Sequence, residues 1–241
     1  MSNKKIYQAA FASASLLSFI VPPGALGNEP VRKSTMLEEI IVTAQKREES
    51  LQETPIAISA FSGEEIERKR ISNVKDLKFF TPSLDVGEGF NGATYLQIRG
   101  IGNDVIVNGA DPGVAVHLDG TFLGTQQYFD SSFFDVERIE VLRGPQGTVY
   151  GRNATGGNIN IVTRDPTEEF DGNAAITLGN YDNVETEAAI SGPLIGEKVL
   201  GRIALVSKRH DGYTPAVNTG QELDDADRIA GRAKLKPESV T

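Results

Sequence analysis

The sequence contains no cysteine and no tryptophan, and only two histidines, His117 and His210, among 241 residues. A disulfide framework and a cysteine-based zinc site are therefore excluded, and two distant histidines cannot form a histidine-rich metal site. Basic residues are also in deficit, with 24 Lys and Arg against 33 Asp and Glu and a formal net charge of −9. An acidic chain of this kind is not expected to bind nucleic acid. We expect no permanently bound cofactor or metal.

Long apolar runs are scarce, and the one marked run lies near the N-terminus. Residues 9–21 are uncharged and largely apolar, Lys4 and Lys5 precede them, and Ala25-Leu26-Gly27 places small residues where a signal peptidase reads. This order predicts a secretory signal peptide over residues 1–27. No later segment approaches the roughly 18 apolar residues of a membrane-spanning helix. Strands of an outer-membrane barrel carry a weaker, alternating signal.

Residues 51–165 read as a compact α+β domain with a small mixed sheet. Ser62 and Glu65 have the spacing of a helix capping box, which predicts a helix to about Arg70. Asn73 opens a second short helix, and Pro82 ends it. Asp119-Gly120 is a turn signal. The expected strands cover 54–61, 94–99, 113–118, 136–142 and 158–163.

Beyond Pro166 the pattern changes to alternation over strands of about ten residues. The expected strands are 170–179, 183–191, 199–208 and 226–236. One face is apolar and the other carries charges such as Glu185, Glu187 and Arg202. A soluble sandwich would also alternate. Charges facing inward and small apolar residues facing outward favour the opening strands of a transmembrane β-barrel over residues 166–241.

A strand followed by glycines at 144, 147, 151, 156 and 157 raises the question of a phosphate-binding loop. The loop 151–158 has the glycine spacing of a Walker loop, but Gly157 and Asn158 replace its lysine and hydroxyl residue. A dinucleotide fingerprint that begins at Gly100 fails at Val105. No G-x-S-x-G or H-E-x-x-H motif is present, so no enzyme activity is predicted. Glycine is instead expected to serve tight turns and close backbone approach.

The segment 37–44 is a short β-prone run between charged flanks, within residues 28–50, which we expect to be flexible. Its chemistry fits a peptide that adds a strand to the sheet edge of another protein. It fits equally an ordinary first strand of the domain that follows. The residues alone leave these alternatives open.

Several motifs in order resemble the TonB-dependent outer-membrane receptors. EIIVTA at 39–44 is similar to the TonB box. The motifs TPSL at 81–84, QIRGIG at 97–102, VHLDG at 116–120, VERIEVLRGPQGT at 136–148 and YGRNATGG at 150–157 are similar to the plug domain of that family. Their order, behind an export signal and before barrel-type strands, makes the resemblance specific. It covers residues 37–241.

The resemblance implies active uptake of a scarce ligand across the outer membrane, with a ferric siderophore as the favoured ligand. The partners it implies are TonB, outer-membrane lipid and the transported ligand. The residues expected to pair with TonB are Glu39, Ile40, Ile41, Val42, Thr43 and Ala44. Arg99 and Arg143 are expected to hold the plug to glutamates of the barrel wall, because a guanidinium binds carboxylate with two hydrogen bonds. The loop 103–111 is expected to reach the ligand through Asn103, Asp104, Asn108 and Asp111.

The chain departs from the family in the number of barrel strands. Four strands are expected here, whereas known bacterial single-chain barrels have at least about eight and transporters of this type about 22. The sequence therefore reads as a plug with the opening of a barrel, a fragment that is not expected to transport alone. The alternative is a soluble periplasmic ligand-binding module built on the plug fold. The motifs do not identify the ligand, since receptors for siderophores, haem, cobalamin and sugars share them.

Overall fold

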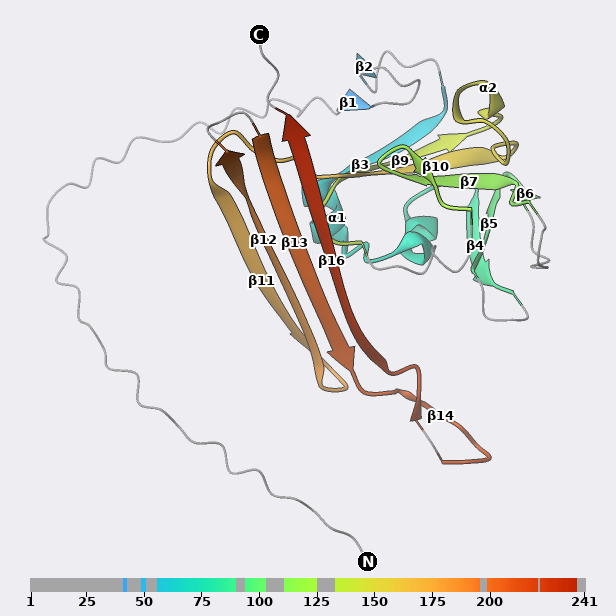
Figure 1. Ribbon diagram of the computed structural model, residues 1–241. Helices are drawn as coiled ribbons and strands as arrows, with labels where there is room; N and C mark the ends of the chain where they lie inside the picture. The colour runs from blue at the N-terminus through green and yellow to red at the C-terminus, as the bar shows by residue number, and fades with distance from the viewer. Residues whose placement is uncertain are drawn as a thin grey trace, which may run out of the picture. The chain divides into compact units, whose positions relative to one another are not determined.

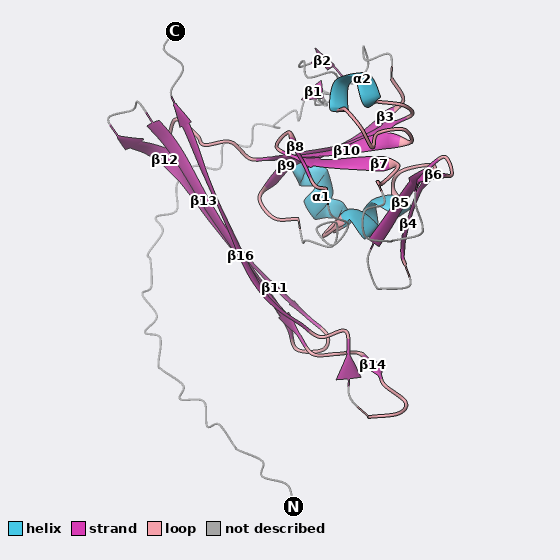
Figure 2. Cartoon of the chain, turned by 45° about the vertical axis from the view of Figure 1, so that its right-hand side comes forward, coloured by secondary structure: helices cyan, strands magenta, loops and turns pink. Residues whose placement is uncertain are grey.

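The computed structural model describes residues 41–42, 49–50, 56–89, 94–102, 111–124, 133–195, 199–220 and 222–237. These residues belong to one compact unit. Strands make up most of them (Figure 2). The predicted signal peptide, residues 1–27, lies outside the described residues.

The first part of the chain is organised around a five-stranded mixed sheet in the order β3-β9-β10-β7-β8 (Figure 1). β10 pairs with β7 in parallel, and the other neighbours are antiparallel. Asp119 and Gly120 connect β7 to β8 with positive φ values of 47° and 78°, as the turn signal predicted. The strands are β3 (Ile58–Ser62), β7 (Val114–Leu118), β8 (Thr121–Phe122), β9 (Val136–Arg143) and β10 (Gly157–Thr163).

Two short helices follow β3, and both begin at the predicted capping residues. At α1 (Gly63–Lys69), Oγ of Ser62 accepts a hydrogen bond from the Glu65 amide at 3.3 Å. At η1 (Val74–Phe79), a 3-10 helix, the reciprocal capping box is formed by Asn73 and Asp76. Each satisfied amide stabilises the start of its helix by about 1 kcal/mol.

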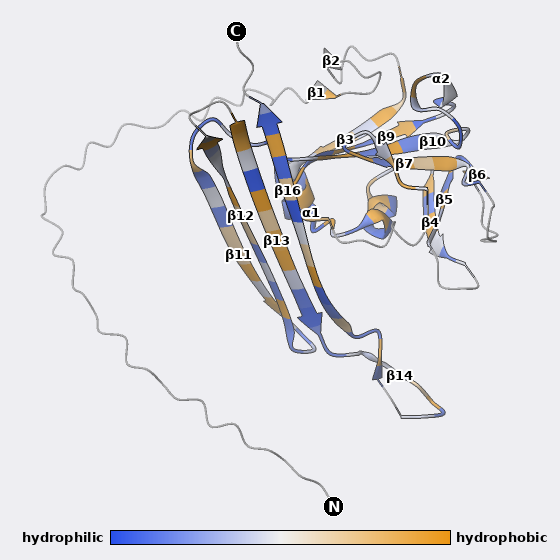
Figure 3. Cartoon of the chain, in the orientation of Figure 1, coloured by the Kyte–Doolittle hydropathy of each residue, from blue (hydrophilic) through white to orange (hydrophobic). Residues whose placement is uncertain are grey.

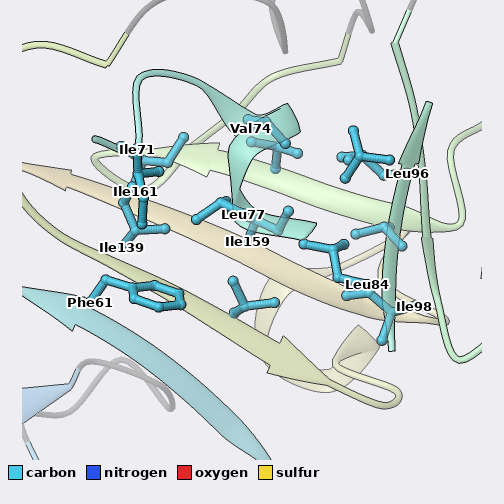
Figure 4. Close-up of a cluster of buried hydrophobic side chains, with 14 of the residues drawn as sticks. Phe61, Ile71, Val74, Leu77, Leu84, Leu96, Ile98, Ile139, Ile159 and Ile161 are labelled. Carbon is cyan, nitrogen blue, oxygen red and sulfur yellow. The ribbon is translucent and has the colours of Figure 1, made fainter. Parts of the chain in front are cut away.

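The helices and one face of the five-stranded sheet enclose the hydrophobic core (Figure 4). Alternation places Ile139 and Val141 of β9 and Ile159 and Ile161 of β10 on this face, each at most 4% exposed. Leu77 of η1 is fully buried against them. Burial of each such side chain stabilises the fold by about 1.5–3 kcal/mol.

A smaller antiparallel sheet, β4-β5-β6, adds Leu84, Val86, Leu96 and Ile98 to the same core. β5 (Thr94–Ile98) confirms the strand expected over 94–99, whereas β4 (Leu84–Glu88) and β6 (Ile101–Gly102) were not predicted as strands. A four-residue helix, α2 (Gly147–Tyr150), follows β9 and was also missed. The described part of the chain contains no helix that is long and apolar enough to cross a membrane.

The four alternating strands beyond Pro166 are confirmed and form one antiparallel sheet, β11-β12-β13-β16 (Figure 1). Their bands of alternating hydropathy are visible in Figure 3. Ile176, Ile190, Ile203 and Ile229 are 53–80% exposed on one face, which we call the outward face. Arg202 lies on the opposite, inward face. The strands are β11 (Asp171–Gly179), β12 (Asn183–Ile195), β13 (Val199–His210) and β16 (Ala226–Pro237), and β14 (Thr214–Pro215) and β15 (Glu222–Leu223) form a small hairpin between the last two.

Candidate functional site

Of the segment predicted to bind TonB, residues 39–44, the structure describes only Ile41 and Val42. Ile41 and Val42 form β1, which pairs antiparallel with β2 (Glu49–Ser50). Val42 is fully buried and packs on Leu142, and Tyr150 of α2 contacts the same small cluster. Glu39, Ile40, Thr43 and Ala44 lie outside the described residues. The two central residues of the predicted TonB box thus form a short strand on the domain, and binding of the box to TonB stays a prediction.

The sheet face opposite the hydrophobic core is polar. Cross-strand pairing aligns Glu140 of β9, Asn160 of β10 and His117 of β7 in one row. Glu140 is fully buried and accepts hydrogen bonds from Arg138 Nε at 3.0 Å and from Asn160 Nδ2 at 3.2 Å. His117 Nδ1 lies 2.6 Å from Oδ1 of Asn158. A buried carboxylate is retained at a cost in desolvation, so this network specifies one arrangement of the three strands.

A cavity of about 570 Å³ opens beside this polar row. Tyr150 and His117 line it with their rings 5.2 Å apart. Burial, and then the nearby charge of Glu140, raises the pKa of Tyr150 to about 12. The phenol therefore stays protonated and remains a hydrogen-bond donor at neutral pH.

Arg99 and Arg143 lie close together at the end of β9. A Cβ added to Gly144 would lie 3.8 Å from Nη1 of Arg99, which places that guanidinium beside the residue that follows Arg143. Nε of Arg143 is buried without a hydrogen-bond acceptor among the described residues. Within those residues neither arginine makes an ion pair, which fits two cations that need carboxylates from elsewhere. Their role as a lock to a barrel wall stays a prediction.

The glycine-rich loop after β9 serves close backbone approach, as predicted. A Cβ on Gly156 would lie 2.6 Å from the carbonyl oxygen of Ile101, and one on Gly157 would lie 2.3 Å from that of Leu142. The Gly156 amide donates to the Gly113 carbonyl at 2.8 Å. Only glycine fits between backbones this close, so the loop holds β6, β7 and β9 together.

The loop predicted to reach the ligand is described only at its last residue. Asp111 is exposed and accepts a hydrogen bond from Asn153 of the glycine-rich loop at 3.1 Å. Asn103, Asp104 and Asn108 lie outside the described residues. The contact ties the base of the loop 103–111 to the glycine-rich loop, and the ligand contacts remain predictions.

Sequence reasoning missed a contact between the first domain and the strand sheet. Asp135, in the turn before β9, accepts hydrogen bonds from Arg202 of β13, from Nε at 2.8 Å and from Nη2 at 2.5 Å. The two side chains are 6% and 3% exposed. Arg232 of β16 donates to the Phe134 carbonyl at 2.8 Å and stacks over the Phe134 ring at 4.4 Å from its centroid. These groups are 67 and 98 residues apart, and no local motif indicates such pairs.

Two lysines of β16 extend this contact. Lys234 Nζ donates to the Thr163 carbonyl at 2.9 Å and to Asp165 at 3.1 Å, and it lies 3.4 Å from Asp119. Lys236 Nζ donates to the other oxygen of Asp165 at 2.9 Å. Burial opposes but does not outweigh these bonds, and the pKa of Asp165 falls below its ordinary value. The inward face of β13 and β16 is therefore basic, and it meets acids of the first domain.

The inward face of β11 and β12 is different. Glu185 and Glu187 of β12 line a cavity of about 700 Å³, and Glu67 and Arg164 of the first domain lie on its other side. The cavity also reaches Ala204 of β13, but ion pairs with the first domain are made by Arg202, Lys234 and Lys236 of the basic strands.

Residues 50–158 match the model of the TonB-dependent receptor plug domain. Residues 50–158 therefore form a plug-type domain, similar to that of the TonB-dependent receptors. The mixed sheet, its helices and the glycine-rich loop make up this plug, and the strands after it have the antiparallel order expected of a barrel that is not closed in these residues.

Relatives and solved structures extend the likeness beyond the plug. The chain is 32% identical over 152 residues to the iron-regulated outer membrane virulence protein of Vibrio cholerae, covering 61% of this chain and 23% of the relative. It is 28% identical over 193 residues to the vitamin B12 transporter of Photobacterium profundum, covering 77% of this chain and 30% of the relative. The crystal structure of the ferric yersiniabactin uptake receptor of Yersinia pestis matches with a TM-score of 0.67 and 26% identity, over 75% of this chain and 28% of that one. The chain thus spans about a quarter of the length of these proteins.

Proposed function

We propose that this chain acts in a TonB-dependent outer-membrane receptor that takes up a scarce ligand, with a ferric siderophore as that ligand. The observation that carries the proposal is one chain that combines a plug domain with four long strands whose outward face is apolar. An apolar outward face and a charged inward face suit strands between lipid and an aqueous lumen. The relatives include an outer membrane virulence protein, a vitamin B12 transporter and a ferric yersiniabactin uptake receptor, which supports this location and a role in uptake.

Cell fractionation tests the location. An outer-membrane protein is expected in the membrane pellet, is released by detergent and migrates differently on gels before and after heating. Clean release with the periplasmic contents would contradict the proposal and favour the soluble ligand-binding module.

TonB is the energising partner in this proposal, bound through residues 39–44. A peptide that adds a strand to a sheet edge relies on its backbone amides, so Thr43→Pro removes one donor and should weaken binding about tenfold or more. The measurement is titration of the 241-residue chain in detergent with the periplasmic domain of TonB. Val217→Pro, at a residue 99% exposed, is the matched control. Equal binding by both variants would contradict the assignment of the box.

Ligand identity is tested separately, by equilibrium dialysis of the chain against a ferric hydroxamate complex, a ferric catecholate complex and cobalamin. Retention of a ferric complex in preference to cobalamin supports the siderophore assignment. Asp111→Asn should weaken that retention, because the loop 103–111 is proposed to touch the ligand, and Asp85→Asn, at an exposed residue of β4, is the control. Preference for cobalamin would overturn the ligand while leaving the receptor function in place.

A further inference from the structure

The inward face of β13 and β16 carries cations directly opposite one another. The register pairs Arg202 with Lys234 and Lys208 with Arg228. Like charges at directly opposed positions destabilise a sheet unless opposite charge lies nearby. Around Arg202 and Lys234 the ion pairs are made with the plug, and Asp171 of β11 adds only a weaker attraction to Arg202.

Three plug acids supply it from three different places in the sequence. Asp119 lies in the β7–β8 turn, Asp135 precedes β9, and Asp165 follows β10. All three lie at the same end of the central strands. They form ion pairs with Arg202, Lys234 and Lys236 at distances between 2.5 and 3.4 Å. Two main-chain carbonyls, those of Phe134 and Thr163, accept further hydrogen bonds from Arg232 and Lys234.

The Asp135–Arg202 pair is the buried centre of this contact, and the Asp165 pairs form its wetter rim. Asp135 and Arg202 are 6% and 3% exposed, whereas Asp165 is 53% exposed. A two-bonded guanidinium–carboxylate pair shielded from water fixes direction as well as distance. The contact therefore orients the plug against these strands.

Arg99 and Arg143 take no part in this contact. Their surroundings are Gly144 and the end of β9, and no ion pair joins them to a described residue. Asp135 stands at the opposite end of β9 from Arg143, since β9 runs from Val136 to Arg143. The two sets of charges thus belong to opposite ends of one plug strand.

We propose that Asp119, Asp135 and Asp165 form an acidic clasp that seats the plug on β13 and β16, and that this seat forms without Arg99 and Arg143. The polarity is the reverse of the predicted lock, because the wall supplies the cations and the plug supplies the carboxylates. The clasp needs only residues of this chain, and the proposal does not depend on the ligand or on TonB.

A zero-length carbodiimide cross-link tests the clasp in the full 241-residue chain in detergent. The reagent joins a carboxylate to an amine in contact, so Asp165 should form an amide with Lys234 or Lys236, identified by mass spectrometry of peptides. Asp135→Asn should lower this yield several-fold, although Asp135 itself is not joined. Arg99→Gln with Arg143→Gln should leave it unchanged. Glu88→Gln, which breaks the 2.5 Å Lys75–Glu88 pair within the plug, is the matched control.

A second variant addresses loss of folding in Asp135→Asn. Asp165→Asn removes the most exposed clasp carboxylate, and amide hydrogen exchange in the peptide containing Lys234 and Lys236 should become faster while β10 stays protected. The proposal is overturned if Asp135→Asn cross-links as well as the unmodified chain, if the double arginine variant loses the cross-link, or if Asp165→Asn leaves exchange unchanged.

Discussion

Asp135 and Arg202 form an ion pair with two hydrogen bonds, 2.8 Å and 2.5 Å long, between a plug turn and strand β13. Both side chains are almost completely buried, so the pair is desolvated and is little screened by salt. Desolvation of two charges offsets much of their attraction, and the pair is worth less to stability than its geometry suggests. Stability is lost when one partner is removed alone, because the other charge then stays buried without a partner.

Arg202→Met is therefore expected to destabilise the chain by about 3–5 kcal/mol, because it leaves the Asp135 carboxylate buried and unpaired. The double variant Asp135→Leu with Arg202→Met should recover most of that loss, since no unpaired charge remains. Urea unfolding in detergent, followed by circular dichroism, gives both values. Additive losses in the double variant would show that the pair is not a coupled unit.

Truncation of the plug core should cost stability in proportion to burial. Leu77→Ala removes a fully buried side chain of η1 and should lower the free energy of unfolding by about 2–5 kcal/mol. Phe79→Ala, two residues further along the same helix and 73% exposed, is the control and should change it by less than about 0.5 kcal/mol. Similar losses from both variants would contradict the position of η1 on the sheet.

The glycine-rich loop gives a prediction about backbone approach. Gly156→Ala would place a methyl group 2.6 Å from the Ile101 carbonyl oxygen, so the loop must shift, and the expected loss is about 1–3 kcal/mol. Gly147→Ala is the matched control, since no atom lies within 4 Å of the added Cβ and alanine favours the helix there. The midpoints of thermal unfolding compare the two variants directly. An unchanged midpoint in Gly156→Ala would show that the loop can accommodate a methyl group.

Tyr150 predicts a change in stability at high pH. Its pKa is raised from 10.0 to about 12 in the folded chain, first by burial and then by Glu140. The folded state holds its proton more tightly than the unfolded state does, so this contribution is complete below pH 10 and is lost as the pH rises toward 12.

Absorbance of tyrosinate measures this directly, because the chain has six tyrosines and no tryptophan or cysteine to interfere. Tyr150→Phe should remove the step of highest pKa, whereas Tyr213→Phe, at a residue 55% exposed, should leave it in place. A high-pH step that survives Tyr150→Phe would show that another tyrosine is the buried one.

Local patterns predicted much of this fold because their causes are local. The capping residues Ser62 and Asn73 and the Asp119-Gly120 turn act on backbone groups within a few residues. The four long strands follow from alternation alone. β12 was expected to end at Ser191, but it continues through Pro193 to Ile195. β11 pairs no further than Ser191, so the missing amide of Pro193 falls where the strand has no neighbour on that side.

The clasp could not be predicted because its partners are distant in sequence and ordinary in type. Asp135 is one of 33 acidic residues, and nothing in its neighbours distinguishes it from the exposed ones. Asp135 differs from them by its burial and by its contact with Arg202 of β13. Both features exist only in the folded chain. Arg99 and Arg143 show the opposite case. The family motifs identify them in the sequence, but neither side chain makes an ion pair with a described residue.

The cavity of about 700 Å³ beside Glu185 and Glu187 has a mechanical consequence. It is large enough to hold water between the plug and β11–β12. Water molecules exchange partners rapidly, so displacement of the plug along these strands replaces one set of hydration contacts with another and breaks little packing. On the side of β13 and β16 the same displacement must break buried ion pairs. We therefore expect the plug to separate from β11 and β12 more readily than from β13 and β16.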